Sequence, residues 1–136
     1  MLHRLVHKLM KKNFFQLLLR FKQLGCNVIY ANFNTMYVYT EKKTFAEAES
    51  HINFVLQNLK TTQLFQYMTL APAEYWSILL FKDAYNFAGI KESNPSRVNN
   101  RWDVVLHLPA VTQKKFLYLT AEFILKVSRH NQKLLR

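Results

Sequence analysis

The chain has 136 residues, of which half are hydrophobic, 15% are aromatic and only two are glycine. This length suits one domain or a piece of one, and the composition excludes disorder and collagen-like repeats. The longest nearly apolar runs, 14–19 and 75–81, are far shorter than the roughly 20 residues of a membrane-spanning helix, so no membrane contact is expected. The single cysteine, Cys26, excludes a disulfide framework and any multi-cysteine metal site, and favours a reducing compartment.

Positive charge dominates the sequence. Nineteen Lys and Arg face eight Asp and Glu, which gives a net charge of +11. The first acidic residue is Glu41, and six basic residues precede it. Such an imbalance indicates contact with nucleic acid or with an acidic partner, although a solvated basic surface, or a piece whose acidic complement lies elsewhere, would have the same composition.

The first half of the chain predicts a helix, a hairpin and a second helix. Apolar residues recur at three- and four-residue steps over 2–24, and Gly25 suits the left-handed position that ends helices. Two β-favouring runs, 28–30 and 36–40, flank a polar turn and predict a β-hairpin. Thr44 and Glu47 then form a capping box that opens an amphipathic helix.

The second half predicts two strands, a loop and a helical end. The runs 65–70 and 75–81 are typical of strands, 83–100 reads as a loop, and 113–129 has helical spacing after the stretch 102–108. The order αββαββαα indicates an α/β (α+β) fold, in which a hairpin and a mixed or antiparallel sheet are covered by helices and the C-terminal part is helical.

Few residues could carry catalysis. The two aspartates, Asp83 and Asp103, are twenty residues apart, and Gly25 and Gly89 are isolated, so no phosphate-binding glycine loop is present. His3 and His7 have the i, i+4 spacing of a metal pair but no nearby acidic or cysteine ligand, so we expect no metal there. Cys26 follows a helix end, where the dipole does not favour a thiolate, and it is interpreted as a small buried residue.

The hairpin is the most informative segment. In an extended chain, Asn32 and Asn34 lie on one side and Phe33 on the other. The run Tyr-Ala-Asn-Phe-Asn-Thr over 30–35 resembles the Tyr-Gly-Asp-Thr-Asp-Ser hairpin of family B DNA polymerases, whose aspartates hold two magnesium ions. Both carboxylates are replaced here by amides.

A closer resemblance covers nearly the whole chain. The run 28–34 is similar to the C-terminal, catalytically inactive polymerase-like half of DNA polymerase epsilon catalytic subunits. The similarity continues through Tyr-Trp-Ser-Ile-Leu-Leu at 75–80, then through Asp83, Asn86 and 89–91, and resumes at 99–102 and 108–109. Ala84-Tyr85 and Ala88 depart from the family pattern, which has proline, a small residue and a first glycine there.

This resemblance implies a non-catalytic segment that supports nuclear DNA replication by holding the polymerase to its accessory subunits and to the replicative helicase. It implies an inactive palm-like segment over 1–91, followed over 92–136 by a loop and a helical, thumb-like segment of the same structural unit. The parent chain would be a DNA-directed DNA polymerase, a nucleotidyltransferase that contacts DNA in another half. Zinc and an iron–sulfur cluster would also lie elsewhere in the parent, with no cofactor in this segment.

The amides predict an inactive site. Two-metal phosphoryl transfer needs anionic oxygens that offset the charge of both ions. Unit charges 4 Å apart interact by about 4 kcal/mol at an effective dielectric near 20, so losing two carboxylates removes several such terms. Asn32 and Asn34 are therefore expected to be degenerate metal-site positions, with no catalytic, metal-binding or cofactor-binding residue in the chain. The simpler interpretation is that amides suit tight turns.

Basic and aromatic residues leave further alternatives open. Four lysines could contact phosphate or could be solvated: Lys11, Lys12, Lys42 and Lys43. Four large aromatic residues are expected in the core rather than as base-stacking platforms: Trp76, Trp102, Phe116 and Phe123. The alternative function is a small, basic, free-standing nucleic-acid-binding protein, and a transferase that uses the amides is a third alternative.

Overall fold

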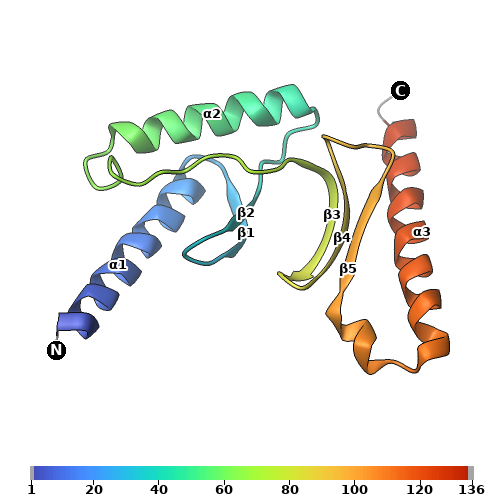
Figure 1. The fold of residues 1–136 in the computed structure, drawn as a ribbon. Coiled ribbons are helices and arrows are strands. Elements are labelled where there is room, and N and C mark those ends of the chain that lie inside the picture. The colour runs from blue at the N-terminus through green and yellow to red at the C-terminus, as the bar shows by residue number, and fades with distance from the viewer. Residues whose placement is uncertain (1, 135–136) are drawn as a thin grey trace. The chain divides into compact units, whose positions relative to one another are not determined.

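The computed structural model describes residues 2–134, and its chain divides into two compact units, 1–71 and 72–136 (Figure 1). Each unit is described by itself. The element order is α1, β1, β2, α2, β3, β4, β5, η1 and α3. The predicted α/β class is confirmed, with two antiparallel sheets and a helical C-terminal part. Within the described residues, no helix is long and apolar enough to cross a membrane.

Helix α1 (Leu2–Gln23) opens the first unit, as the apolar spacing predicts. Gly25 lies just after its end, and the φ of this residue, 82°, lies in the left-handed region that glycine adopts without steric cost. The N–H of Gly25 donates to the carbonyl of Lys22, and the N–H of Cys26 donates to that of Phe21. These two bonds satisfy carbonyls that the end of the helix would otherwise leave unpaired.

The predicted hairpin follows this turn. Strands β1 (Asn27–Ala31) and β2 (Met36–Tyr39) pair antiparallel, with Ala31 opposite Met36 and a register irregularity between Val28 and Tyr30. Within the described part of the chain they form a two-stranded sheet.

Helix α2 (Phe45–Thr61) begins as the capping box predicts, because the Thr44 hydroxyl accepts the N–H of Glu47 at 3.3 Å. Val55 and Leu59 of α2 belong to one buried cluster with residues of α1 and with Cys26. The fully or nearly fully buried side chains of this core are Leu17, Phe21, Cys26, Val55, Leu59 and Phe65.

The predicted strand over 65–70 is wrong. Residues after α2 form consecutive turns, in which the N–H of Phe65 donates to Thr62 and that of Met68 donates to Phe65. Phe65 is buried in the core, whereas Tyr67 is 90% exposed. Phe65, and in part Leu70, therefore pack against the core from a loop, and the run does not form one face of a strand.

The second unit is built on a three-stranded antiparallel sheet in the order β3-β4-β5. Its strands are β3 (Trp76–Asp83), β4 (Asn86–Lys91) and β5 (Val98–Trp102). The first strand confirms the prediction for 75–81, but the predicted loop over 83–100 is wrong, because it contains all of β4 and the start of β5. The order αββαββαα is corrected accordingly to three strands in this unit.

A short 3-10 helix, η1 (Asp103–His107), leads through Pro109 into α3 (Ala110–Leu134). Helix α3 contains the predicted range 113–129 and runs alongside the sheet in Figure 1. Ile124 of α3 is buried against Ala88 and Ile90 of the central strand β4. Each unit therefore has its own apolar core.

Candidate functional site

The hairpin turn is shaped by the amide of Asn32. Its Oδ1 accepts the N–H of Asn34 at 2.9 Å and that of Thr35 at 2.7 Å, while its Nδ2 donates to the hydroxyl of Tyr30 at 3.1 Å. The backbone N–H of Asn32 also donates to the carbonyl of Thr35. This arrangement is the local turn that Asn and Asp side chains commonly form. The Asn32 carbonyl oxygen is therefore already engaged by two backbone donors.

Phe33, at the tip of the same turn, lies against α1. Its ring centroid is 5.1 Å from that of Phe14 and 6.4 Å from that of His7. Asn32 and Asn34 are both exposed. Whether the two amides face one side remains a prediction, as does their assignment as degenerate metal-site positions.

The four lysines proposed to contact phosphate are all exposed, and the structure does not bring them together in one groove. Lys11 lines an open groove on α1 together with Arg4 and Lys8, neither of which the sequence reasoning proposed as a phosphate contact. Lys42 instead lies near enough to Cys26 to affect its pKa. The complete lining of the groove is His3, Arg4, His7, Lys8 and Lys11.

Helical spacing was the signal that could have identified this groove. Positions three and four apart share one helix face, so the basic residues of the N-terminal half of α1 adjoin one another. The rings of His3 and His7 stack with their centroids 6.5 Å apart. Among residues 2–134, no group of three or more His, Cys, Asp or Glu side chains is arranged to hold a metal ion.

Cys26 and His51 form a part-buried polar contact. Their Sγ and Nε2 atoms are 3.4 Å apart, and Cys26 is only 1% exposed. Burial raises the pKa of the Cys26 thiol, and the nearby charge of Lys42 lowers it by less. A protonated, buried thiol is a poor nucleophile, so this pair has a packing role, as the sequence interpretation of Cys26 expects.

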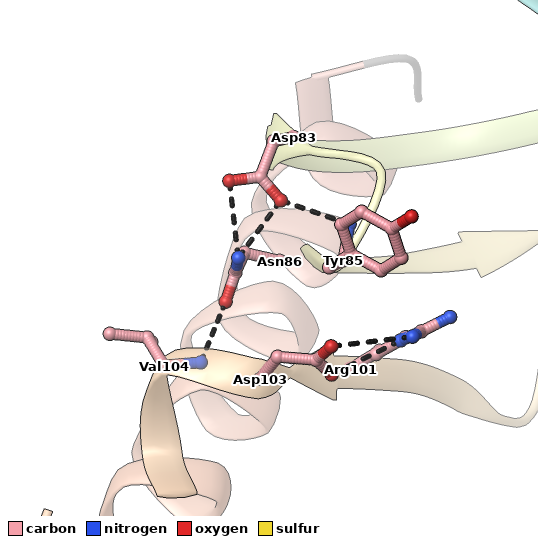
Figure 2. Close-up of polar contacts among 6 residues, drawn as sticks. All are labelled: Asp83, Tyr85, Asn86, Arg101, Asp103 and Val104. Carbon is pink, nitrogen blue, oxygen red and sulfur yellow. Dashed lines mark hydrogen bonds and ion pairs between the residues drawn. The ribbon is translucent and has the colours of Figure 1, made fainter. Parts of the chain in front are cut away.

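The turn between β3 and β4 carries a polar network (Figure 2). The Asp83 carboxylate accepts both the N–H of Tyr85 at 2.9 Å and the side-chain amide of Asn86 at 2.8 and 3.1 Å. Asn86 is buried, and its Oδ1 accepts the N–H of Val104 at 3.0 Å. Asp83 and Asn86, which are both part of the family resemblance, therefore join the β3–β4 turn to the start of η1.

A second contact reinforces this turn. The Arg101 guanidinium donates to Asp103 at 3.3 and 3.4 Å and lies 5.0 Å from the ring centre of Tyr85. Asn86, Arg101 and Asp103 thus organise the corner where β3, β4 and η1 meet. Both partners of the ion pair are exposed, which limits its contribution to stability.

The aromatic residues expected in the core behave differently from one another. Trp102 is half-buried and contacts Phe116 edge to face at 5.6 Å, and Trp76 contacts Phe87 in the same geometry at 5.8 Å. Phe123 is 54% exposed, so its core assignment is wrong. Its helical position places it beside the buried face of α3 rather than on it.

These features can be compared with known proteins. Residues 1–90 match the family model described as a domain of unknown function, DUF1744, and the chain belongs to this family.

Three relatives that resemble the chain are named as catalytic subunits of DNA polymerase epsilon. Two of them, both from Arabidopsis thaliana, are 33% and 34% identical over 128 and 129 residues, in each case 90% of this chain and 6% of the relative. The third, from Schizosaccharomyces pombe, is 35% identical over 136 residues, 95% of this chain and 6% of the relative. The resemblance to this group is confirmed, and the chain spans about 6% of the length of these relatives.

Proposed function

We propose that the chain is a segment of the non-catalytic half of a DNA polymerase epsilon catalytic subunit. Its role is architectural: it holds the replicative polymerase to its accessory subunits and to the replicative helicase in the nucleus. The observation that carries this proposal is the similarity over 90–95% of the chain to proteins with that name, in a segment that has amides at the hairpin. Nucleotidyl transfer then belongs to another part of the parent, which would be a DNA-directed DNA polymerase.

The hydrogen bonds of the Asn32 side chain support a structural role for the hairpin. A neutral amide whose oxygen already accepts two backbone N–H groups supplies neither charge nor a free ligand to a magnesium ion. Asn34 adds no charge either. The turn is therefore maintained by the bonds between the Asn32 amide and the backbone and by the packing of Phe33, which suits an architectural segment.

An apolar groove beside β1 supports an origin in a larger sheet. Strand β1 pairs with β2 alone in the described chain, and an open groove of about 570 Å³ runs between β1 and α1. Apolar side chains on both sides line it, including the exposed Phe15, Leu19 and Ile29. An upstream strand of the parent would cover these exposed apolar side chains.

The two parts of the segment would correspond to different parts of the parent fold. Residues 1–91 would be the inactive palm-like segment, and 92–136 would be the loop and helical, thumb-like segment. The zinc and iron–sulfur groups of the parent would lie outside these residues. One cysteine, buried beside His51, does not provide the ligand set of either group.

The competing function is a small, basic, free-standing nucleic-acid-binding protein. The charge distribution favours it, because the ion pairs of the described residues all lie in the second unit and leave the basic residues of the first unit unneutralised. An antibody raised against the segment distinguishes these two functions by the length of the polypeptide that it detects. The architectural function requires a polypeptide of which these residues form about 6%, whereas the competing function requires one of this length.

A core variant tests the architectural role in the full-length parent polypeptide. Val55 is completely buried, so V55D should disrupt the first unit, whereas Q57D introduces the same charge on the exposed side of α2. We expect V55D to abolish co-purification with accessory subunits while primer extension continues, and Q57D to retain both. A V55D parent that assembles normally, or that assembles but no longer incorporates nucleotides, would contradict the proposal.

A further inference from the structure

The N-terminal half of α1 presents an open cationic groove of about 330 Å³, which we call the α1 groove. It is lined by five residues that carry basic or imidazole side chains: His3, Arg4, His7, Lys8 and Lys11. All five are exposed, so their polar ends are available to a ligand.

The helix arranges these groups on one face. Arg4, Lys8 and Lys11 are separated by four and three residues, and they therefore follow one another along about 10 Å of helix axis. His3 and His7 adjoin them and stack with centroids 6.5 Å apart. The His7 ring also meets the edge of Phe33 from the hairpin tip at 6.4 Å, which restricts its orientation.

No acidic group in the described part of this unit neutralises the groove. The sequence contains no Asp or Glu before Glu41. The ion pairs of the described residues, Lys82–Asp83, Lys91–Glu74 and Arg101–Asp103, all lie in the second unit. Closely spaced cations with no partner attract a polyanion, and they release their counterions when it binds.

We infer that the α1 groove binds the phosphate backbone of DNA. The Arg4 guanidinium can donate two parallel bonds to one phosphate, while Lys8 and Lys11 act as point charges and the imidazoles donate N–H bonds. In duplex DNA one strand carries a phosphate about every 3.4 Å of the axis, so about 10 Å spans roughly four successive phosphates, and each of the three cations can reach a separate one. These contacts carry no sequence information, so binding is expected to be non-specific.

The lining favours DNA over an anionic membrane surface. A membrane-binding helix presents cations beside the apolar side chains that enter the lipid. The exposed apolar residues of this part of α1, such as Leu5 and Leu9, are not among the lining residues of the groove. The inference goes beyond the architectural role and does not depend on it. A segment that positions other subunits does not need to contact DNA, and contact with DNA does not prevent that role.

Fluorescence anisotropy with a labelled duplex of about 20 base pairs tests this inference on the 136-residue chain, between about 50 and about 200 mM NaCl. The groove variant is R4Q/K8Q/K11Q. The matched control, K115Q/K126Q/R129Q, removes the same charge from exposed positions on α3. A third variant, R4K/K8R/K11R, retains the charge of the groove. Glutamine, lysine and arginine are all good helix formers, so α1 should remain folded.

We expect the groove variant to reduce the slope of log affinity against log salt by roughly 2.7, which corresponds to three lost phosphate contacts. The α3 control and the charge-retaining variant should keep the slope of the wild type. Equal losses in the groove and control variants would overturn the inference, as would an unchanged groove variant or the absence of binding.

A parallel measurement uses phosphatidylcholine vesicles with about 30% phosphatidylserine, and a polyglutamate peptide serves as an acidic-protein probe. Tighter binding of either probe than of DNA, lost in the groove variant, would assign the groove to that ligand and overturn the inference. Co-purification of accessory subunits by a parent polypeptide that carries the groove variant is scored separately. A failure of DNA binding is thereby distinguished from a failure of the architectural proposal.

Discussion

At the residue scale, Asp83 is a carboxylate whose ionised form accepts several hydrogen bonds. Its pKa lies below the ordinary value of 3.8, first because the Asn86 amide donates to the carboxylate, then because the Tyr85 N–H does, with a smaller effect of Lys82. Burial raises the pKa of Asp83 but does not cancel the lowering that these bonds cause. The ionised form is therefore the one that the β3–β4 turn stabilises.

The lowered pKa predicts a pH-dependent contribution to stability. Folding favours the carboxylate, so this contribution is fully present above the unfolded-state value near 3.8 and is lost as the pH falls through the lower folded-state pKa. The difference in urea midpoint between wild type and D83N should be positive at about pH 6 and should shrink toward zero in strong acid. Both tryptophans lie in the second unit, so their fluorescence reports on it.

The exposed Glu92 provides the control, because E92Q removes a carboxylate outside this network. It should leave the midpoint nearly unchanged over the same pH range. A difference between wild type and D83N that stays constant down to about pH 3 would show that the Asp83 bonds do not favour the ionised form.

At the scale of elements, Gly89 determines how closely β3 and β4 approach. A Cβ atom at this position would lie 2.5 Å from the carbonyl oxygen of Ile78 and 2.8 Å from the Trp76 ring. The oxygen belongs to the backbone of the paired strand and cannot rotate away. Gly25 differs, because its nearest neighbour, the His51 ring, is 3.7 Å away and only its φ of +82° opposes a side chain.

Substitutions at the two glycines should therefore destabilise the fold for different reasons. We expect G89A to lower the free energy of unfolding by about 1–3 kcal/mol through overpacking, and G89N to lower it further. G25A should cost about 1–2 kcal/mol, and G25N should recover part of this because asparagine tolerates the left-handed region. Urea unfolding followed by circular dichroism measures all four variants. The interpretation would be contradicted if asparagine were less destabilising than alanine at residue 89 but not at residue 25.

Elements with strong local signals could be predicted from the sequence. Thr44 caps α2 and Gly25 ends α1 as expected, because capping and left-handed turns depend on a few neighbouring residues. Strand β4 was missed because its sequence contains Asn86 and Gly89, which resemble loop residues when read alone. Their roles in the structure, a buried network and a close strand contact, depend on partners that are distant in the sequence.

The candidate site could be predicted only in part for the same reason. The amides of the hairpin are visible in the sequence, but the engagement of Asn32 by two backbone donors depends on the folded turn. Lys11 was identified by its charge. Arg4 and Lys8 share its helix face, a relation that depends on the helical spacing of three and four residues and that runs of adjacent charges do not reveal.

At the scale of the molecule, charge and packing are distributed differently between the two units. Each has its own buried cluster, one centred on Leu17 and Val55 and the other on Ala88 and Ile124. The ion pairs of the described chain occur in the second unit, whereas the α1 groove lies in the first. Catalysis would require anionic ligands in the first unit, beside the hairpin, where the sequence supplies few acidic residues.

This deficit predicts that restoring the hairpin carboxylates does not restore polymerisation. The double variant N32D/N34D should retain its fold, since an aspartate at residue 32 can accept the same two backbone N–H bonds. A two-metal site needs a further carboxylate, and among residues 2–134 no suitable cluster of acidic, histidine or cysteine side chains exists. We therefore expect no primer extension by the 136-residue chain with either magnesium or manganese.

Isothermal titration with magnesium chloride provides the independent readout. Two adjacent carboxylates should bind the ion only weakly, because magnesium keeps its waters unless several anionic ligands are positioned around it. The double amide variant N32Q/N34Q is the uncharged control. Saturable, magnesium-dependent incorporation of nucleotides by N32D/N34D would show that the amides alone silence a site that is otherwise complete, and the architectural proposal for this segment would then have to be abandoned.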